Sequence, residues 1–283
     1  MLAKLLIDLL LALASYQVQV RWVFAAKENP KHPPTLPHWK AFGRLAKRVV
    51  RAYLGQPSVN PSKIPEGAAV YVVHHQNMKG PIQAVAALPG EPHVWALHVF
   101  LDSDACFRQY YNYTFTQRFG WAKPLAFATA WVLQWIIPPF IRSVGAVPVY
   151  RKSMALRETM RQSQELLAQG ESLVICPDVD YSSDSGQMGE AYTGFLALEG
   201  AYCRRTGTHL PFVPVHCCEQ NGGITLGEPV YCVPQEGEAP KQVRQRTAQL
   251  LIQRMNELAV ASGDLQQLRS APDSSQPSTV ESA

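Results

Sequence analysis

Short runs of β-branched and aromatic residues alternate along this chain with longer segments of helical periodicity. Strands alternating with helices predict a single α/β domain with a mixed, mostly parallel central sheet flanked by helices. The expected strands are 69–73, 93–100, 146–150, 172–176 and 212–217, with two shorter runs in 224–233. The expected helices are 82–88, 125–141, 154–169, 191–205 and 242–258, and no structure is predicted for 102–120.

This domain is expected to span 56–265 and to be followed by a disordered Ser/Pro-rich tail, 266–283. Residues 1–55 carry an apolar segment and a basic amphipathic helix. The apolar segment is shorter than the roughly 20 residues that cross a bilayer, and Asp8 interrupts it. We favour a retained helix on a membrane surface or on the core, with a signal peptide as the alternative. The basic helix could equally lie on an anionic bilayer or pack on the core.

The composition limits the possible partners and ligands. A net charge of +4 is too weak to predict nucleic-acid binding, but it suits the surface of an anionic membrane. The six cysteines form no C-x-x-C pair, which indicates reduced thiols in the cytosol. His93 and His98 lie an odd number of residues apart on one expected strand, so they should face opposite sides. No metal site is therefore predicted.

The run Val70–Val73 ends in two histidines, and Gly80-Pro81 breaks the backbone shortly afterwards. This places His75 on the loop that leaves a buried strand, where its side chain can face a cleft. A histidine suits general-base catalysis near neutral pH. The sequence therefore makes His75 the first candidate for a catalytic residue, although it could also be a structural loop histidine.

Other strands also end in polar clusters. Arg151 follows the strand 146–150, and Asp178 and Asp180 follow 172–176. A further strand contains Val213-Pro214-Val215 and is followed by histidine. Ligands of open α/β sheets bind at such strand ends. No nucleophile elbow, P-loop, dinucleotide fingerprint or H-E-x-x-H motif is present.

The order of these segments resembles the PlsC-like glycerolipid acyltransferases, the family of 1-acyl-glycerol-3-phosphate and lysophospholipid acyltransferases. That family carries an N-H-x-x-x-x-D box, a G-x-x-x-x-x-R box, an F-P-E-G-T-R box and a short V-P-V strand. The resemblance covers roughly Pro65 to Pro234 and includes the helix between the second and third boxes. It implies transfer of a fatty acyl group from acyl-CoA or acyl carrier protein to a hydroxyl of a glycerolipid-like acceptor, with no cofactor.

The resemblance also assigns roles to individual residues. It makes His75 the general base and Asp178 the acid retained in the third box. Arg151 matches the arginine that holds the acceptor's phosphate. His74 stands where the family has asparagine, and with Arg151, Asp180 and Tyr181 it forms the expected substrate-binding set.

Two departures from the family pattern bear on activity. Gly80 falls on the aspartate that orients the family's histidine, so another carboxylate would have to reach His75. The candidates are Asp102, Asp104, Asp178 and Asp180. Val179-Asp180-Tyr181 replaces Gly-Thr-Arg in the third box, which makes the pocket more acidic and disfavours a phosphate monoester.

The expected protein is thus an acyltransferase associated peripherally or monotopically with the cytoplasmic face of a membrane. The apolar segment 125–141 is expected to be a buried helix that forms a wall of the acyl groove, rather than a re-entrant helix. The main alternative is a pseudoenzyme of the same fold that binds lipid without turnover. A membrane-associated hydrolase using His75 and an aspartate is the third possibility.

Overall fold

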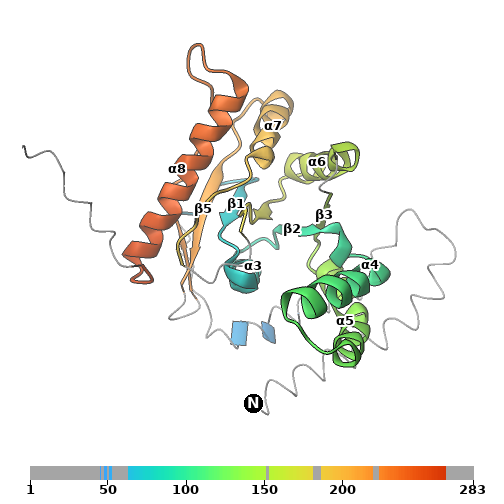
Figure 1. Cartoon of the computed structure of the whole chain (residues 1–283). Helices are drawn as coiled ribbons and strands as arrows, with labels where there is room; N and C mark the ends of the chain where they lie inside the picture. The colour runs from blue at the N-terminus through green and yellow to red at the C-terminus, as the bar shows by residue number, and fades with distance from the viewer. Residues whose placement is uncertain are drawn as a thin grey trace, which may run out of the picture.

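The computed structural model describes residues 45, 48–49, 51–52, 63–150, 153–180, 186–218 and 223–265. Six strands form one sheet in the order β3-β2-β4-β1-β5-β6 (Figure 1). Their bounds are Val70–Val73 (β1), His93–Leu97 (β2), Val147–Val149 (β3), Leu173–Ile175 (β4), Phe212–Cys217 (β5) and Ile224–Leu226 (β6). The described pairings are parallel except β5 with β6. The α/β class and the mixed, mostly parallel sheet are confirmed.

The α-helices are Lys79–Ala87 (α3), Ser103–Arg108 (α4), Lys123–Ser143 (α5), Ser153–Ala168 (α6), Leu198–Thr206 (α7) and Pro240–Ala261 (α8). Three short 3₁₀ turns and one π-helix, η4 at Gln109–Arg118, complete the description. Local chemistry sets several of these bounds. Pro240 occupies the first turn of α8, where a missing N–H costs nothing. Gly207 ends α7 in the left-handed conformation that glycine adopts most easily.

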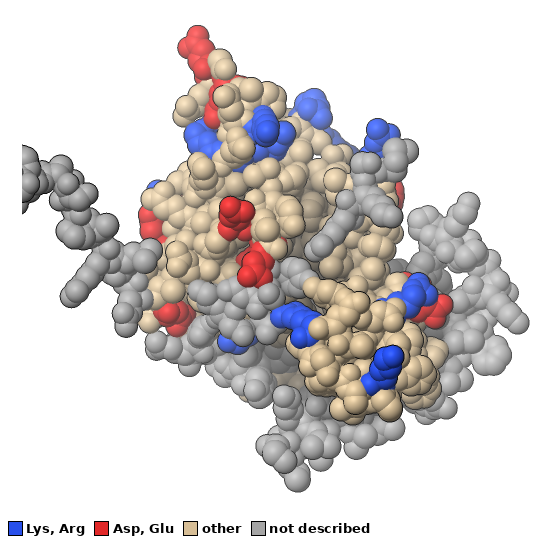
Figure 2. All heavy atoms as spheres, viewed as in Figure 1, with Lys and Arg blue, Asp and Glu red and all other residues tan. Residues whose placement is uncertain are grey.

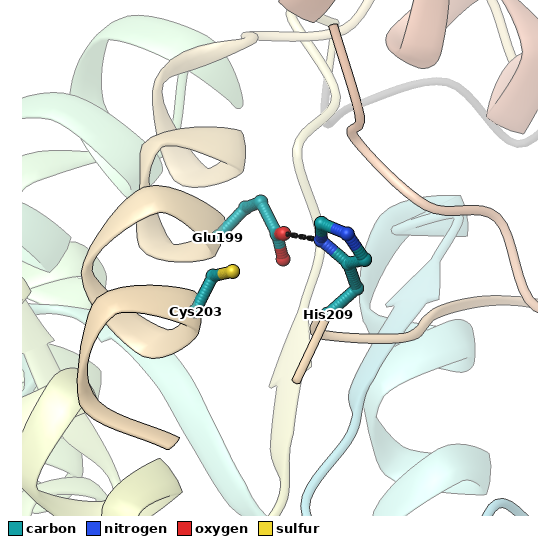
Figure 3. A group of neighbouring side chains, drawn as sticks. All are labelled: Glu199, Cys203 and His209. Carbon is teal, nitrogen blue, oxygen red and sulfur yellow. Dashed lines mark hydrogen bonds and ion pairs between the residues drawn. The ribbon is translucent and has the colours of Figure 1, made fainter. Parts of the chain in front are cut away.

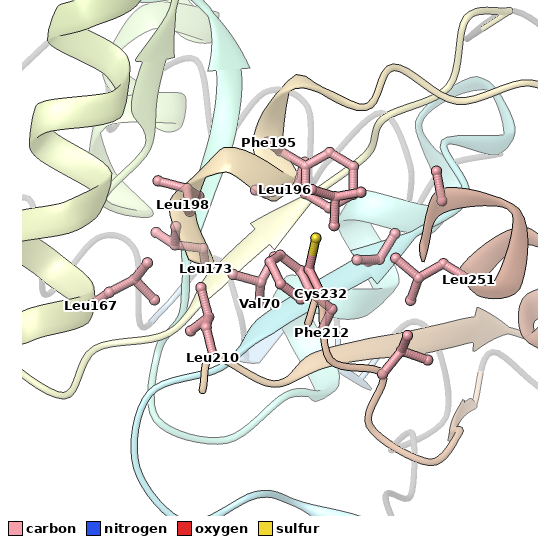
Figure 4. Close-up of a cluster of buried hydrophobic side chains, with 14 of the residues drawn as sticks. Val70, Leu167, Leu173, Phe195, Leu196, Leu198, Leu210, Phe212, Cys232 and Leu251 are labelled. Atoms are coloured by element: carbon pink, nitrogen blue, oxygen red, sulfur yellow. The ribbon is translucent and has the colours of Figure 1, made fainter. Parts of the chain in front are cut away.

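Helices cover the two faces of the sheet unequally. Alternate residues of β1 point to opposite faces, as the pleat of a strand requires. Tyr71 and Val73 belong to the cluster that α3 covers. Val70 and Val72 belong to the larger cluster, which contains residues of α6, α7 and α8 and is drawn in Figure 4. The strands are thus buried on both faces, which explains why they read as continuous apolar runs.

Most expected elements are present with ends shifted by a few residues, and two differ more. The strand expected to reach residue 100 ends at Leu97, so His98 is not part of it. The imidazole rings of His93 and His98 each hydrogen-bond a backbone carbonyl. His93 Nδ1 bonds the carbonyl of Gly145 at 2.7 Å, and His98 Nδ1 bonds that of Val149 at 3.2 Å. The helix expected from Ala191 begins later, because Ala191 forms a β-bridge with Asp178.

The expected N-terminal apolar helix lies outside the described residues, as does the tail 266–283. The five described residues of the basic helix, all helical, are Leu45, Arg48, Val49, Arg51 and Ala52. Arg51 donates a hydrogen bond from Nε to the carbonyl of Ala86, near the end of α3. This contact ties the basic helix to the α/β domain.

The expectation that 125–141 is a buried helix is wrong. The segment forms one continuous helix, α5, that runs through Pro138 and Pro139. Only one side of α5 is covered, and Trp131 on the other side is 53% exposed. The reason is its position: α5 packs with α4 and η4 beyond the β3 edge of the sheet, away from the main core (Figure 1). A helix at the edge of a domain can bury only one side.

Gly80 is required by close packing of the backbone after β1. A Cβ built on Gly80 would lie 1.9 Å from the carbonyl oxygen of His74. No side chain of any kind fits there in this backbone. The path of the chain from β1 into α3 therefore leaves room for glycine alone at this position.

We expect Gly80→Ala to lower the free energy of unfolding by about 3 kcal/mol or more, because the methyl group must displace backbone atoms. Urea denaturation followed by circular dichroism measures this change. Gly189→Ala is the matched control, because a Cβ at Gly189 meets nothing within 4 Å. Equal stability of the two variants would contradict the described packing.

Candidate active site

The carboxyl ends of β1 and β4 meet at a point where the chain leaves the sheet in opposite directions. β1 and β4 are neighbouring parallel strands. The chain leaves β1 through α3 on one face, and it leaves β4 towards α7 on the other. Such a switch point in strand order creates a crevice outside the carboxyl ends, where ligands of open α/β sheets bind.

A histidine and an aspartate from these two strand ends form a buried pair. His74 Nδ1 donates to Asp178 Oδ1, and the two residues are 6% and 7% exposed. The other oxygen of the same carboxylate, Oδ2, accepts the backbone N–H of His75 at 3.0 Å. Asp178 thus holds the loop after β1 through both of its oxygens. A His–Asp pair of this kind orients an imidazole and stabilises its charged form.

The contacts of the two histidines imply different tautomers. Because Asp178 accepts from Nδ1 of His74, the neutral ring carries its proton there and its Nε2 has a lone pair. His75 Nδ1 instead accepts the backbone N–H of Met78 at 3.3 Å. The neutral ring of His75 therefore carries its proton on Nε2. The described contacts thus place the proton of the neutral ring on Nδ1 in His74 and on Nε2 in His75.

A short antiparallel bridge fixes Asp178. The backbone N–H of Val179 donates to the carbonyl of Glu190 at 3.0 Å, and that of Tyr192 donates to Pro177 at 2.7 Å. Asp178 is the residue that pairs with Ala191 across this bridge. Its carboxylate is thus carried by backbone that is hydrogen-bonded on both sides.

The loop after β1 has an unusual backbone. Gln76 and Met78 have φ values of 43° and 79°, a region that residues other than glycine seldom adopt. Gln76 is also 1% exposed, so packing holds it in this conformation. Strained backbone of this kind is concentrated at functional sites. The strain lies directly beside His74 and His75.

The other sequence-predicted residues are distributed unevenly. Arg151 and Tyr181 lie outside the described residues, and Asp180 is exposed at the edge of the site. Asp102 accepts the N–H of Ala105 at 2.8 Å and caps α4. Of the four proposed carboxylates, Asp178 is the one with a described contact to the histidine loop, and it reaches the ring of His74 and the backbone of His75.

A second buried His–Asp pair lies on the neighbouring strand. His216 Nε2 contacts Asp264 Oδ2 at 2.7 Å, and both side chains are almost fully buried. His216 lies within β5 and follows Val215, which pairs with Val73, so His74 and His216 are at the same level of neighbouring strands. Asp264 comes from the turn after α8. No local motif marks this residue, so sequence reasoning missed it.

Glu199, Cys203 and His209 bring an oxygen, a sulfur and a nitrogen within 4.8 Å of one another (Figure 3). Glu199 Oε1 accepts from His209 Nδ1 at 2.6 Å, and its Oε2 accepts the N–H of Leu210 at 2.7 Å. These bonds tie α7 to the start of β5, at the amino-terminal end of that strand. His74 follows the carboxyl end of the neighbouring parallel strand β1. The donor set suits zinc, but both carboxylate oxygens already serve a structural contact.

A surface pocket of about 810 Å³ lies between residues 235–238 and α8. Glu190 and Arg246 are among its lining residues, and neither His74 nor Asp178 is. The chemistry-bearing groups are therefore at the strand ends and not in this pocket.

The buried cysteines are poor nucleophiles. Burial raises the pKa of Cys106 and Cys217 to about 12. Burial likewise raises the pKa of Cys176 well above its ordinary value, and the nearby Asp178 carboxylate adds to the effect. Cys176 is close to the candidate site in sequence, but as a neutral thiol it is unsuited to forming an acyl-enzyme.

Comparison with known proteins gave no match: no protein-family model matches the chain, and no curated protein matches it.

Asp178→Asn should lower the free energy of unfolding by about 1–3 kcal/mol, because it weakens two buried hydrogen bonds. It should also shift the ¹⁵N resonance of His74 Nδ1, since the charged acceptor is lost. Urea denaturation and imidazole ¹⁵N NMR check these two outcomes. Glu66→Gln, which neutralises an exposed carboxylate, is the control. Unchanged His74 resonances would argue against the pair.

Thiol labelling at pH 8 should modify Cys203 before Cys106 and Cys217. A pKa of about 12 leaves about one thiolate in 10⁴ at this pH, whereas Cys203 is partly exposed. Peptide mass spectrometry after timed labelling gives the order, and Cys203→Ser should remove the earliest product. Early labelling of Cys106 or Cys217 would contradict the described burial.

Proposed function

We propose that this protein transfers a fatty acyl group from a thioester donor to a hydroxyl of a glycerolipid or lysophospholipid-like acceptor. The observation that carries the proposal is the buried His74–Asp178 pair at the carboxyl ends of β1 and β4. It supplies an oriented general base at the position where an α/β sheet binds its ligands. The ordered boxes of the sequence support acyl transfer as the reaction.

The proposed reaction needs one proton acceptor that later becomes a proton donor. The acceptor's hydroxyl oxygen attacks the thioester carbonyl while its proton passes to Nε2 of His74. The tetrahedral intermediate then collapses, the C–S bond breaks, and the imidazolium returns the proton to the leaving thiolate. Asp178 keeps the Nδ1 proton in place and stabilises the imidazolium between the two steps. The products are an ester and a free thiol, and His74 returns to its starting state.

Assigning the base to His74 departs from the family-based assignment to His75. The tautomer argument favours His74, because the Nδ1 of His75 accepts a backbone hydrogen bond. Within the proposal, the backbone N–H of His75 donates to Asp178 and so helps to hold its carboxylate in place. That His75 is the base remains a prediction, and the assay below distinguishes it from the assignment of the base to His74.

The donor and acceptor follow from the resemblance. Acyl-CoA or acyl carrier protein would bring the acyl group, and no cofactor takes part in the proposed reaction. Asp180 is exposed and follows Asp178 by two residues, and within the proposal its carboxylate makes the acceptor side more acidic. This favours an acceptor that is neutral or amine-bearing near its hydroxyl over a phosphate monoester. Arg151 and Tyr181 complete the proposed acceptor site, which would lie at the cytoplasmic face of a membrane.

A second candidate function is lipid binding without turnover. The observation that favours it is the burial of the base: His74 is only 6% exposed, so a substrate hydroxyl must reach a nearly enclosed ring. A His–Asp pair in such a place could instead serve to hold the loop after β1. Hydrolysis by the same dyad is a third outcome, in which water replaces the lipid hydroxyl.

The proposal predicts ester formation when purified protein receives radiolabelled acyl-CoA and a panel of lysolipids. His74→Ala should lower the rate by about 10³-fold or more, since an oriented general base contributes 10²–10⁴-fold. Asp178→Asn should lower it by about 10²-fold or more, and His75→Ala by much less. Thin-layer chromatography separates ester from free fatty acid and so distinguishes transfer from hydrolysis.

His209→Gln is the matched histidine control, because His209 lies before the amino-terminal end of β5, away from the proposed site. This variant should retain the wild-type rate. A larger loss in His75→Ala than in His74→Ala would return the base to His75. No acyl product from any acceptor, with lysolipid still bound, would favour the non-catalytic function. Circular dichroism of each variant separates lost chemistry from lost folding.

A further inference from the structure

The outer side of α5 is an unusually apolar surface for a soluble domain. Three large side chains on it are at least two-fifths exposed: Leu125, Trp131 and Val132. The turn before α5 adds Phe119 and Trp121, which are 51% and 38% exposed. We call these five residues the α5 patch. Exposed apolar patches of this kind mark interaction sites.

The opposite side of α5 already has its partners. Its buried residues recur at the helical spacing of four, at Ala126, Ala130, Gln134 and Pro138. They face α4 and η4, and Phe115 of η4 joins Ala126 and Ala130 in a small apolar cluster. The α5 patch is therefore a second apolar face, left uncovered after the helix has packed on the domain.

The charged side chains nearest to the patch in sequence are cations. No Asp or Glu occurs between Asp104 and Glu158, whereas Arg118 and Lys123 flank the patch at the turn before α5. Both of these cations are exposed, and Arg118 lies over the ring of Phe119 at 5.6 Å. Figure 2 shows the surface over α4 and α5 as mostly uncharged, with Lys and Arg groups on it and an acidic group at its border. Such a surface complements an anionic one.

The helix is placed to lie along a membrane rather than across it. By length and composition α5 could cross a bilayer, with 28% of its apolar window buried. However, its carboxyl end leads directly into β3, and Arg142 donates to the carbonyl of Leu101 beside α4. Its packing partner η4 carries Gln109, Asn112 and Gln117, which are costly to bury in lipid. Both constraints keep α5 at the domain surface.

We propose that the α5 patch docks the protein on an anionic lipid bilayer, with its aromatic rings in the interfacial layer and Arg118 and Lys123 at the headgroups. Trp and cationic side chains are the groups that prefer this layer. This membrane contact does not depend on acyl transfer, because binding to vesicles is measured without substrate. The other possible occupants of the patch are a second copy of the chain and its own apolar segment 5–14.

The test is co-sedimentation of the full chain with vesicles of phosphatidylcholine alone or mixed with phosphatidylserine. We expect stronger binding to the mixed vesicles, and a decrease of this difference at high salt. Leu125→Ser/Trp131→Ser should weaken binding to the mixed vesicles about tenfold or more, since two exposed anchors are removed. Arg118→Ser/Lys123→Ser should remove most of the advantage of the mixed vesicles.

Tyr231→Ser is the matched control, because Tyr231 is 48% exposed but lies outside the patch. It should bind vesicles as the wild type does. If Leu125→Ser/Trp131→Ser also binds as the wild type does, the proposal is wrong. If Leu9→Lys alone abolishes binding, the anchor is the segment 5–14 and the proposal is again wrong. A wild-type dimer in size-exclusion chromatography that becomes monomeric only in Leu125→Ser/Trp131→Ser would assign the patch to self-association and overturn it too.

Discussion

The carboxylate of Asp178 is the interaction on which the functional end of this molecule depends. It joins two strand ends by accepting from a side chain of the loop after β1 and from the backbone of the next residue. The antiparallel bridge between 177–179 and 190–192 fixes the backbone that carries this carboxylate. Without it, the loop after β1 would lose its contacts to both His74 and the backbone of His75. One acidic group therefore combines a structural role with the chemistry proposed for the site.

Much of the fold could be read from the sequence because strand burial leaves a strong local pattern. The five main strands, the helices α6 and α8 and the polar strand ends were predicted from runs of apolar residues. The direct pairing of His74 with Asp178 could not be predicted from the sequence, because it depends on which of the two histidine rings faces the neighbouring strand. The resemblance to the acyltransferase boxes pointed to His75, whereas the backbone turn after β1 brings the ring of His74 to Asp178. Asp264 shows the same limit, since its partner His216 is 48 residues away.

The misjudged helix shows a second limit of sequence patterns. Composition correctly indicated that 125–141 is apolar and helical, but it could not say whether protein or another environment covers that apolar surface. The answer depended on the order of the strands, because β3 is the edge strand and α5 packs beyond it. An apolar helix at such an edge has one side covered by the domain and another turned outward.

Gly80 couples the path of the backbone to the source of the carboxylate. The approach of His74's carbonyl means that no side chain can enter at 80 while the present backbone is kept. A carboxylate that contacts the histidine loop must therefore come from another element, as Asp178 does. A change at residue 80 alone would force the backbone between β1 and α3 to move, so this residue and the turn can only change together.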